Sequence, residues 1–159
     1  MTVLSFDQSS TVTGYALFVD GKLDLYGKFS FDDKDVGIRL NKIRYQVFTL
    51  IQLHRPDHVV FEDIQFQDNV ANSVVTFKVL AEVYGVISQL LTELEIPHST
   101  VLAGTWKKTL GIGGRTRPEQ KKNAQKHVKD IYNVDVIQDI ADAICIGEHY
   151  IKMSKSAWD

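Results

Sequence analysis

The sequence predicts an α/β fold whose mixed five-stranded sheet begins as an antiparallel meander and continues with parallel strands. Two observations carry this prediction. Three short segments rich in β-branched and aromatic residues open the 159-residue chain, and no helical pattern separates them. Further along, segments with helical spacing alternate with short apolar segments, which is typical of parallel strands joined by helical crossovers.

The predicted meander consists of strands at residues 3–6, 13–19 and 22–29. The pair Asp20-Gly21 lies between the second and third strands. A tight type I′ turn needs positive φ at both central positions, and this pair supplies residues that tolerate it. The opening segment is therefore expected to fold as a hairpin-linked sheet.

The rest of the chain alternates between helices and strands. Apolar residues at helical spacing predict a helix over residues 37–54, which Pro56 follows, and a long helix over residues 70–94. Short strands are expected at residues 58–63 and, after Pro97, at residues 98–102. The predicted order up to this point is βββαβαβ.

The C-terminal third is predicted to be helical. It contains a short helical turn around Trp106, a glycine-rich loop, a basic helix from about Pro118, and a final helix over residues 137–153. The tail from Ser154 to Asp159 is expected to fray, unless Trp158 docks it against the domain. The expected core positions of the final helix are Ile137, Ile140, Ala141, Ile144 and Ile151.

Composition indicates one globular domain spanning residues 1–159. Hydrophobic residues make up 44% of the chain and charged residues 24%, as in ordinary soluble proteins. The single cysteine, Cys145, is read as a small core residue, and no Cys and His cluster has zinc spacing. No apolar run approaches the roughly 20 residues that span a bilayer, so we expect no membrane contact and a cytoplasmic location.

Basic residues are concentrated in one segment. The net charge is -2, but residues 104–129 hold eight basic residues and one acid, so this segment carries +7 and the remainder -9. Such asymmetry indicates a surface that faces a polyanion, although a solvated helix face is an alternative explanation.

Four acids lie beside apolar residues on predicted regular elements. Asp7 and Glu62 end the first and fourth strands, while Asp139 and Asp142 lie three residues apart on one face of the last helix. Parallel neighbouring strands would bring Asp7 and Glu62 to the same sheet edge. Taken singly, each strand-end acid is more typical of a turn or a cap, and Asp139 of a first-turn helix acid.

Convergence of four carboxylates would require a compensating cation, because like charges raise one another's pKa. Mg²⁺ and Mn²⁺ prefer carboxylate oxygens. Two such ions roughly 3.5–4 Å apart support in-line attack on a phosphodiester. The acids therefore predict metal-dependent phosphodiester hydrolysis.

Three motifs resemble one known family. The segment "LSFDQSSTVTGYALF" resembles the first-strand motif of the RuvC-type Holliday-junction resolvases, "FEDIQF" their fourth-strand glutamate motif, and "DIADAICIGEH" their paired-acid helix. The resemblance covers nearly the whole chain. It implies an RNase H-like fold, a homodimer, and magnesium-dependent nicking of branched DNA, with Asp7, Glu62, Asp139 and Asp142 as metal ligands. We expect the helix over residues 70–94 to form the dimer interface.

The resemblance also implies roles for basic and aromatic residues. Lys107 or Lys108 matches a family lysine near the scissile phosphate, and Lys121 or Lys122 matches a second lysine that opens the following helix. Trp106 is expected either to stack on a base or to anchor the core. The expected DNA contacts are Gln65, Phe66, Trp106, Arg115, Arg117, Lys121, Lys122 and Lys126.

Two departures from the family pattern concern the DNA contacts. Asp7-Gln8-Ser9 replaces the Asp-Pro-Gly of the cellular enzymes, and Gln65 replaces an aromatic residue, with Phe66 next to it. Both departures resemble the phage-encoded branch of the family, so a bacterial or phage-infected cell is the expected setting.

Three alternative functions compete with this one. An actin-like or hexokinase-like ATPase needs a second lobe, and "LGIGGRTR" lacks the Lys-Ser/Thr ending of a nucleotide-binding P-loop, so no nucleotide cofactor is expected. The four acids count against a non-catalytic DNA-binding module, because carboxylates next to DNA weaken binding unless metal is present. Forks, flaps or RNA in a hybrid are alternative substrates for the same nuclease. His149 is read as a structural residue or an indirect neighbour of the site.

Overall fold

The computed structural model describes residues 1–67 and 72–157. Five strands form one sheet in the order β3-β2-β1-β4-β5. β1 (Thr2–Asp7), β2 (Val12–Val19) and β3 (Lys22–Ser30) are antiparallel neighbours, and β4 (His58–Glu62) and β5 (His98–Val101) continue parallel to β1. The predicted mixed sheet is confirmed, including the hairpin at Asp20-Gly21, where both residues have positive φ.

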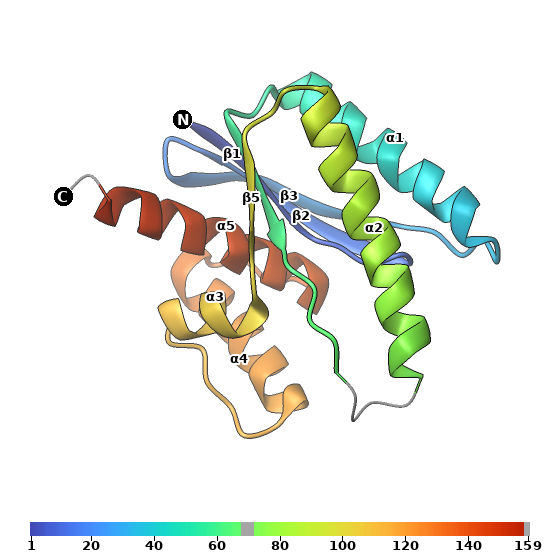
Figure 1. Cartoon of the computed structure of the whole chain (residues 1–159). Coiled ribbons are helices and arrows are strands. Elements are labelled where there is room, and N and C mark those ends of the chain that lie inside the picture. Colours follow the sequence, from blue (N-terminus) through green and yellow to red (C-terminus); the bar gives the residue numbers. More distant parts are fainter. Residues whose placement is uncertain (68–71, 158–159) are drawn as a thin grey trace.

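Helices cover both faces of the sheet (Figure 1). α1 (Val36–His54) and α2 (Ser73–Glu93) lie on one face, and α3 (Ala103–Thr109), α4 (Arg117–Tyr132) and α5 (Gln138–Ser156) lie on the other. Capping side chains stabilise the N-terminal ends of two helices. Asp35 caps α1 by accepting from the Ile38 backbone N–H, and Thr116 caps α4 by accepting from Glu119.

Alternation along the strands assigns each side chain to one of two cores. Leu4 and Phe6 of β1 pack with α1 and α2, whereas Val3 of β1 and Val60 of β4 pack with the helices of the opposite face. Because successive side chains of a strand point to opposite faces, odd positions of β1 and even positions of β4 face α5. This parity places the site described below.

Several predicted boundaries differ from the structure. α5 extends to Ser156, so the expectation that the tail frays from Ser154 is wrong. Ile137 is not a core residue but the largely exposed N-cap of α5. The α2 prediction began at residue 70; residues 70 and 71 lie outside the described residues, as does Trp158, and the helix begins at Ser73.

α2 also corrects the expectation about apolar length. By length and composition alone, this helix is apolar enough to cross a bilayer, and only about a fifth of its most apolar stretch is buried. Its C-terminal half packs on the sheet through Val83, Ile87, Leu90 and Leu91. Its first turns expose Val74 and Val75, so much of the apolar surface of α2 lacks a partner within the described chain.

Candidate active site

Asp7 and Glu62 lie side by side at the edge of the sheet. The parallel register of β1 and β4 pairs Phe6 with Phe61, so the next position on each strand carries the acid. Strand parity directs both side chains toward the face that α5 covers, because Asp7 follows Ser5 by two residues and Glu62 follows Val60 by two. The convergence expected from topology therefore has a local cause.

Two glycines let α5 approach the sheet closely. Gly14 is the register partner of Asp7, and a Cβ there would overlap the Asp139 backbone carbonyl. At Gly147, a Cβ would collide with the Phe18 ring. Between these points the buried Ser5 hydroxyl donates a 2.7 Å hydrogen bond to the Ala143 carbonyl. These contacts hold Asp139 and Asp142 next to β1.

Asp142 is a buried acid, and within the described part of the chain only one of its two carboxylate oxygens accepts a hydrogen bond. Its side chain is 8% exposed. One carboxylate oxygen, Oδ2, accepts from Gln138 Nε2 at 3.3 Å, while Oδ1 is buried and has no hydrogen-bond partner among residues 1–67 and 72–157. Burying an unpaired carboxylate oxygen costs free energy unless a positive group compensates it.

The acids interact strongly enough to change their proton affinities. Burial, followed by repulsion from Glu62, Asp142 and Asp139, raises the pKa of Asp7 well above its usual range. Burial, and then the Glu62 charge, raises the pKa of Asp142 to about 7. Burial also raises the pKa of Glu62, against opposing effects of Trp106, Lys107 and Arg117. All four acids therefore belong to one electrostatic cluster, which we call the acid cluster.

Glu62 is fixed by two residues from other elements. The buried Gln8 side chain donates to the Glu62 carbonyl and accepts from the Glu62 N–H at 3.2 Å, so its amide extends the β1–β4 ladder by one pair. The Trp106 indole N–H donates to Glu62 Oε2 at 2.9 Å. Trp106 is 0% exposed, so its expected contact with DNA is wrong and the core-anchor alternative holds.

Lys107, one of the two candidate lysines, lies next to the acid cluster. The Lys107 ammonium lowers the pKa values of Asp7, Glu62 and Asp142, and it lies 5.3 Å from the centre of the Trp106 ring. Its Nζ donates to Gln120 at 3.3 Å, which ties it to α4. Lys108 is exposed on α3. Geometry therefore favours Lys107 for a role at the acids.

The donor set suits a hard divalent cation, because it consists of carboxylates and includes the unpartnered Asp142 Oδ1. Within residues 1–67 and 72–157, however, no three His, Cys, Asp or Glu side chains lie close enough to hold one ion. The carboxylates are therefore close enough to affect one another's pKa values, but their side chains are not arranged around one ion position in this structure.

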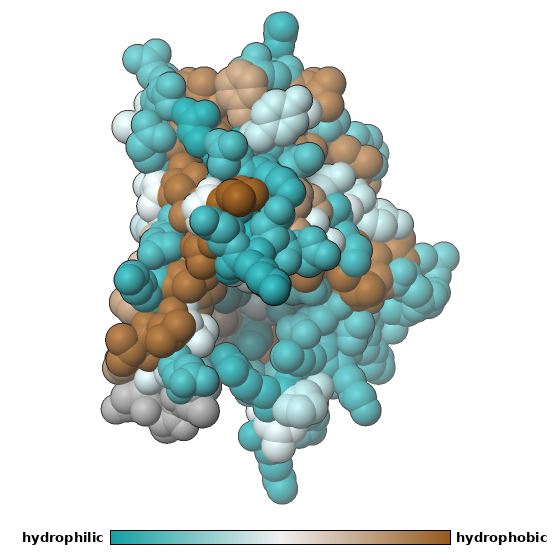
Figure 2. Space-filling view, turned by 90° about the vertical axis from the view of Figure 1, so that its right-hand side faces the viewer, coloured by the Kyte–Doolittle hydropathy of each residue, from teal (hydrophilic) through white to brown (hydrophobic). Residues whose placement is uncertain are grey.

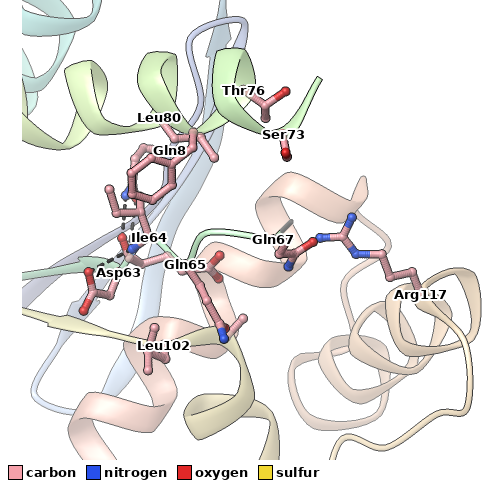
Figure 3. Close-up of a pocket in the computed structure, with 13 residues that line it drawn as sticks. Gln8, Asp63, Ile64, Gln65, Gln67, Ser73, Thr76, Leu80, Leu102 and Arg117 are labelled. Atoms are coloured by element: carbon pink, nitrogen blue, oxygen red, sulfur yellow. Dashed lines mark hydrogen bonds between the residues drawn. The ribbon is translucent and has the colours of Figure 1, made fainter. Parts of the chain in front are cut away.

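A cleft opens beside Glu62 (Figure 3). Its volume is about 200 Å³. The walls come from the segment after β4, the first turns of α2, the start of α3 and Arg117 of α4. Gln65, an expected DNA contact, lines this cleft, and so does Arg117.

The remaining expected DNA contacts are spread over two surfaces. Phe66 is 48% exposed and packs edge-on against Phe77, with ring centres 5.5 Å apart. The exposed basic residues of the second surface follow α3 along the glycine-rich loop and α4, where Lys126 pairs with Asp130; they are Arg115, Lys121, Lys122 and Lys126. His149 is half-buried beside β5, and its Nδ1 has no hydrogen-bond partner in the part of the chain that the structure describes.

Sequence reasoning missed three residues that shape the site. In the sequence, Gln8 is only a departure from the family pattern. Its bonds to Glu62 depend on how β1 pairs with β4, which the sequence alone does not reveal. Gly14 and Gly147 carried a readable signal, because a glycine inside a strand or helix often marks a close approach of two backbones. Neither glycine was interpreted in that way.

Comparison with protein families gives a match to "Crossover junction endodeoxyribonuclease RuvC" over residues 3–148. Two similar curated proteins carry the same description. One is from Dictyoglomus thermophilum and the other from Dictyoglomus turgidum. Each is 28% identical to this chain, and each alignment covers 95% of this chain and 96% of the relative.

Solved structures show the same fold. The Thermus thermophilus RuvC in complex with a Holliday junction substrate superposes with a TM-score of 0.75 at 18% identity, over 98% of this chain and 96% of that one. The Fowlpox virus resolvase in complex with Holliday junction DNA gives a TM-score of 0.57 at 19% identity, over 97% and 99%. The RNase H-like fold prediction is confirmed.

Proposed function

The chain belongs to the RuvC family of crossover junction endodeoxyribonucleases, and from this premise we propose that it resolves four-way DNA junctions by nicking them at the acid cluster. The observation that carries the proposal is that Glu62 and Asp142 raise the pKa of Asp7, and that Glu62 also raises the pKa of Asp142. Three acids from three elements interact at one sheet edge, next to a lysine. Family membership sets aside the ATPase alternative.

Asp7, Glu62, Asp139 and Asp142 are the proposed ligands of two Mg²⁺ or Mn²⁺ ions. Such ions supply an activated water and stabilise the leaving oxygen in phosphodiester hydrolysis. The residues around them orient the ligands: Gln8 and Trp106 fix Glu62, and Gln138 holds one oxygen of Asp142. Outer partners of this kind restrict the ligands to few orientations.

Lys107 is proposed to contact the scissile phosphate. Its position beside three acids and its bond to Gln120 support this role. A lysine ammonium next to the phosphate stabilises charge that develops in the transition state. The exposed basic residues of the glycine-rich loop and α4 are proposed to bind the DNA arms, with a salt-dependent contribution to affinity.

The protein is proposed to act as a homodimer through α2. The exposed valines of this helix, Val74 (69%) and Val75 (64%), support the proposal, since contiguous exposed apolar side chains mark interaction surfaces. Figure 2 shows hydrophobic side chains on the side of the molecule where α1 and α2 lie. Two copies would supply two active sites, one for each strand that must be cut.

The proposed setting is the cytoplasm of a bacterial or phage-infected cell. The curated relatives come from bacteria, which supports the bacterial part of this proposal. The phage origin stays a prediction. Its basis is the segment Asp7-Gln8-Ser9, which departs from the cellular pattern.

A nicking assay on a synthetic four-way junction tests the proposed function. The wild type is expected to nick the junction with Mg²⁺ or Mn²⁺ and not in EDTA, whereas Asp7→Asn should bind the junction without cutting it. Asp24→Asn, an exposed aspartate on β3, is the matched control and should cut normally. Forks, flaps and RNA–DNA hybrids compare the substrate range.

Two outcomes would contradict the proposal. Binding of the junction without cleavage under any of these conditions would instead indicate a non-catalytic binding module. Equal cleavage by the wild type and Asp7→Asn would show that the chemistry lies outside the acid cluster.

A further inference from the structure

We propose that Gln120 is a positioning residue for Lys107: its amide oxygen holds the lysine ammonium beside the acid cluster but out of contact with the carboxylates. The inference deepens the proposed function and rests on it, because Lys107 is the proposed contact of the scissile phosphate. It assigns a task to a neutral residue of α4, and it explains how a flexible lysine keeps one position beside the acids.

The Lys107 ammonium is held by α4 and not by the acids. It lies close enough to three of the acids to lower their pKa values. Within the described part of the chain, however, it forms no ion pair with a carboxylate, and its hydrogen bond is to Gln120 Oε1 at 3.3 Å. An ammonium bonded to the carboxylate oxygens would occupy the ligands that hard cations prefer. The bond to Gln120 therefore leaves those oxygens available.

The glycine-rich loop, residues 110–116, sets the orientation of the Gln120 amide. Gln120 Nε2 donates to the Gly114 carbonyl at 3.1 Å, so the amide oxygen is the end that faces Lys107. The reverse orientation would place amide N–H groups against an ammonium, which has no acceptor. A single amide orientation therefore satisfies the loop and the lysine together.

A close approach at Gly114 brings the loop against Gln120. Gly114 has a φ of +150°, which residues with a Cβ rarely adopt. A Cβ there would lie 2.8 Å from Gln120 Cγ and 2.8 Å from the Gln120 backbone nitrogen. The absence of a side chain at Gly114 therefore makes room for Gln120.

The first turn of α4 gives Gln120 a fixed backbone. Thr116 accepts from the Glu119 N–H, and the Glu119 carboxylate accepts from a loop backbone N–H at 2.9 Å. Reciprocal bonds of this kind stabilise the start of a helix. Asn123 Nδ2 also donates to the Gly113 carbonyl at 2.7 Å, which ties the loop to α4 a second time. Gln120 follows Glu119 directly, so its backbone lies inside this network.

The backbone of Lys107 is fixed as well. Its carbonyl accepts from the Ile112 N–H at 2.8 Å, and Ile112 is a buried core residue. The side chain between this backbone and the ammonium is a flexible aliphatic stem with many rotamers. The bond to Gln120 selects the rotamers that place the ammonium beside the acids. Without it, the ammonium would sample other positions, including direct pairing with a carboxylate.

A neutral acceptor suits this task. A carboxylate at position 120 would hold the ammonium more strongly and add negative charge where a phosphate must approach. An ammonium has three N–H donors, and the Gln120 oxygen engages one of them. The remaining donors of Lys107 are therefore available to a phosphate oxygen.

The first test is spectroscopic and uses the metal-free protein with isotope-labelled lysine. A hydrogen-bonded ammonium exchanges its protons slowly and gives a separate side-chain NMR signal, and the signal that disappears in Lys107→Ala belongs to Lys107. This signal should vanish or shift in the near-isosteric Gln120→Met. It should persist in Asn123→Ala, which loses only a bond to the loop. Gln52→Met, at an exposed glutamine of α1, is the matched control and should also keep it.

The second test is single-turnover cutting of a four-way junction. Gln120→Met should lower the rate for the bound junction by about 10- to 100-fold, because a small displacement of a catalytic group has an effect of this size. The junction Kd should change by less than about 2-fold, since no phosphate contact is removed. Asn123→Ala and Gln52→Met should cut at the wild-type rate. Adding Gln120→Met to Lys107→Ala should cost nothing further, because both changes act through the same ammonium.

Several results would overturn the positioning role. They are an unchanged Lys107 signal in Gln120→Met, equal losses of rate in Gln120→Met and Asn123→Ala, or independent losses of rate in the variant that combines Gln120→Met with Lys107→Ala. Circular dichroism checks that each variant is folded, and Gln120→Ala repeats both tests with a smaller side chain. Failure of the wild type to cut any branched DNA would instead contradict the proposed function, and the metal-free NMR signal would still decide whether Gln120 holds the lysine.

Discussion

Gly14 lies opposite Asp7 in the β1–β2 ladder, and the side chain it lacks leaves the space that the Asp139 backbone occupies. One register pair therefore contains both a proposed ligand and the gap through which a second ligand approaches. The same contact packs the first turn of α5 against β2.

Replacing Gly14 by alanine should damage both stability and catalysis. A Cβ at this position must push Asp139 away, and overpacking of this kind costs about 1–3 kcal/mol. Urea unfolding and the nicking assay measure the two effects. Gly104→Ala on α3 is the matched control, since a Cβ there meets nothing and alanine favours the helix. Wild-type stability and activity in Gly14→Ala would disprove the positioning role.

Asp142 should make the metal-free protein less stable as pH rises. Its pKa is raised from 3.8 to about 7, so the folded state binds its proton more tightly than the unfolded state does. The free energy of unfolding should therefore fall between about pH 4 and pH 7 and stay lower above that range. Asp7 and Glu62, whose pKa values are also raised, act in the same direction.

Asp142→Asn should remove this contribution and stabilise the metal-free protein at about pH 8, by up to about 4 kcal/mol. Urea unfolding in EDTA at about pH 5 and about pH 8 checks the sign. The exposed Asp24→Asn should leave the pH dependence unchanged. A destabilised Asp142→Asn at the higher pH would mean that the carboxylate has a partner within the protein.

Gln8→Ala should weaken metal binding more than it weakens the fold. The variant loses both side-chain bonds to the Glu62 backbone, so the orientation of this proposed ligand is less restricted. Loss of such an outer partner typically costs about 10- to 100-fold in metal affinity or activity. A Mg²⁺ titration of nicking rate should show a higher midpoint, while Gln52→Ala should match the wild type. An unchanged midpoint of the Mg²⁺ titration would show that Gln8 does not orient a metal ligand.

Lys107 and Lys108 form a matched pair for separating catalysis from DNA affinity. Lys107→Ala should lower the single-turnover rate by roughly 10²–10³-fold, the scale for losing one group that stabilises transition-state charge. Lys108→Ala should leave that rate near wild type and at most weaken binding in a salt-dependent way. The reverse order of effects would assign the catalytic role to Lys108.

Val74→Asp should dissociate the proposed homodimer, because a charge would be buried in an apolar interface. Light scattering at micromolar concentration measures the mass, and junction cutting should become uncoupled between the two strands. Leu53→Asp on α1 is the control, since Leu53 is equally exposed and lies outside α2. A monomeric wild type, or a dimer that survives Val74→Asp, would exclude this surface.

Much of the fold was predictable because its signals are local. The hairpin at Asp20-Gly21, the five strands and the order of the long helices follow from turn chemistry and apolar spacing, and the structure confirms them. The final helix was harder. Its central turns are buried on all sides between the sheet and the helices α3 and α4. Ile137 was misplaced because it is the extended N-cap residue before the helix and therefore does not continue the apolar stripe.

The site was predictable only in part, since its details depend on contacts between distant residues. Parity along β1 and β4 is a local signal, and it directs Asp7 and Glu62 to the α5 face. The Trp106 indole reaches Glu62 across 44 positions of sequence, and no spacing rule foretells that bond. The sequence alone also does not show which of Lys107 and Lys108 lies next to the acids, because this depends on how α3 packs against distant elements.

The Gln8 side chain takes the place of a backbone rung between β1 and β4. A hydrogen-bonded pair made by a side chain can be removed by a single amino-acid substitution, whereas a pair made by two backbones cannot. The end of β1 is therefore a point where a descendant of this protein could tighten or loosen the hold on Glu62 without rebuilding the sheet. A single mutation at this position can therefore alter the proposed ion binding at Glu62, and with it the proposed cleavage.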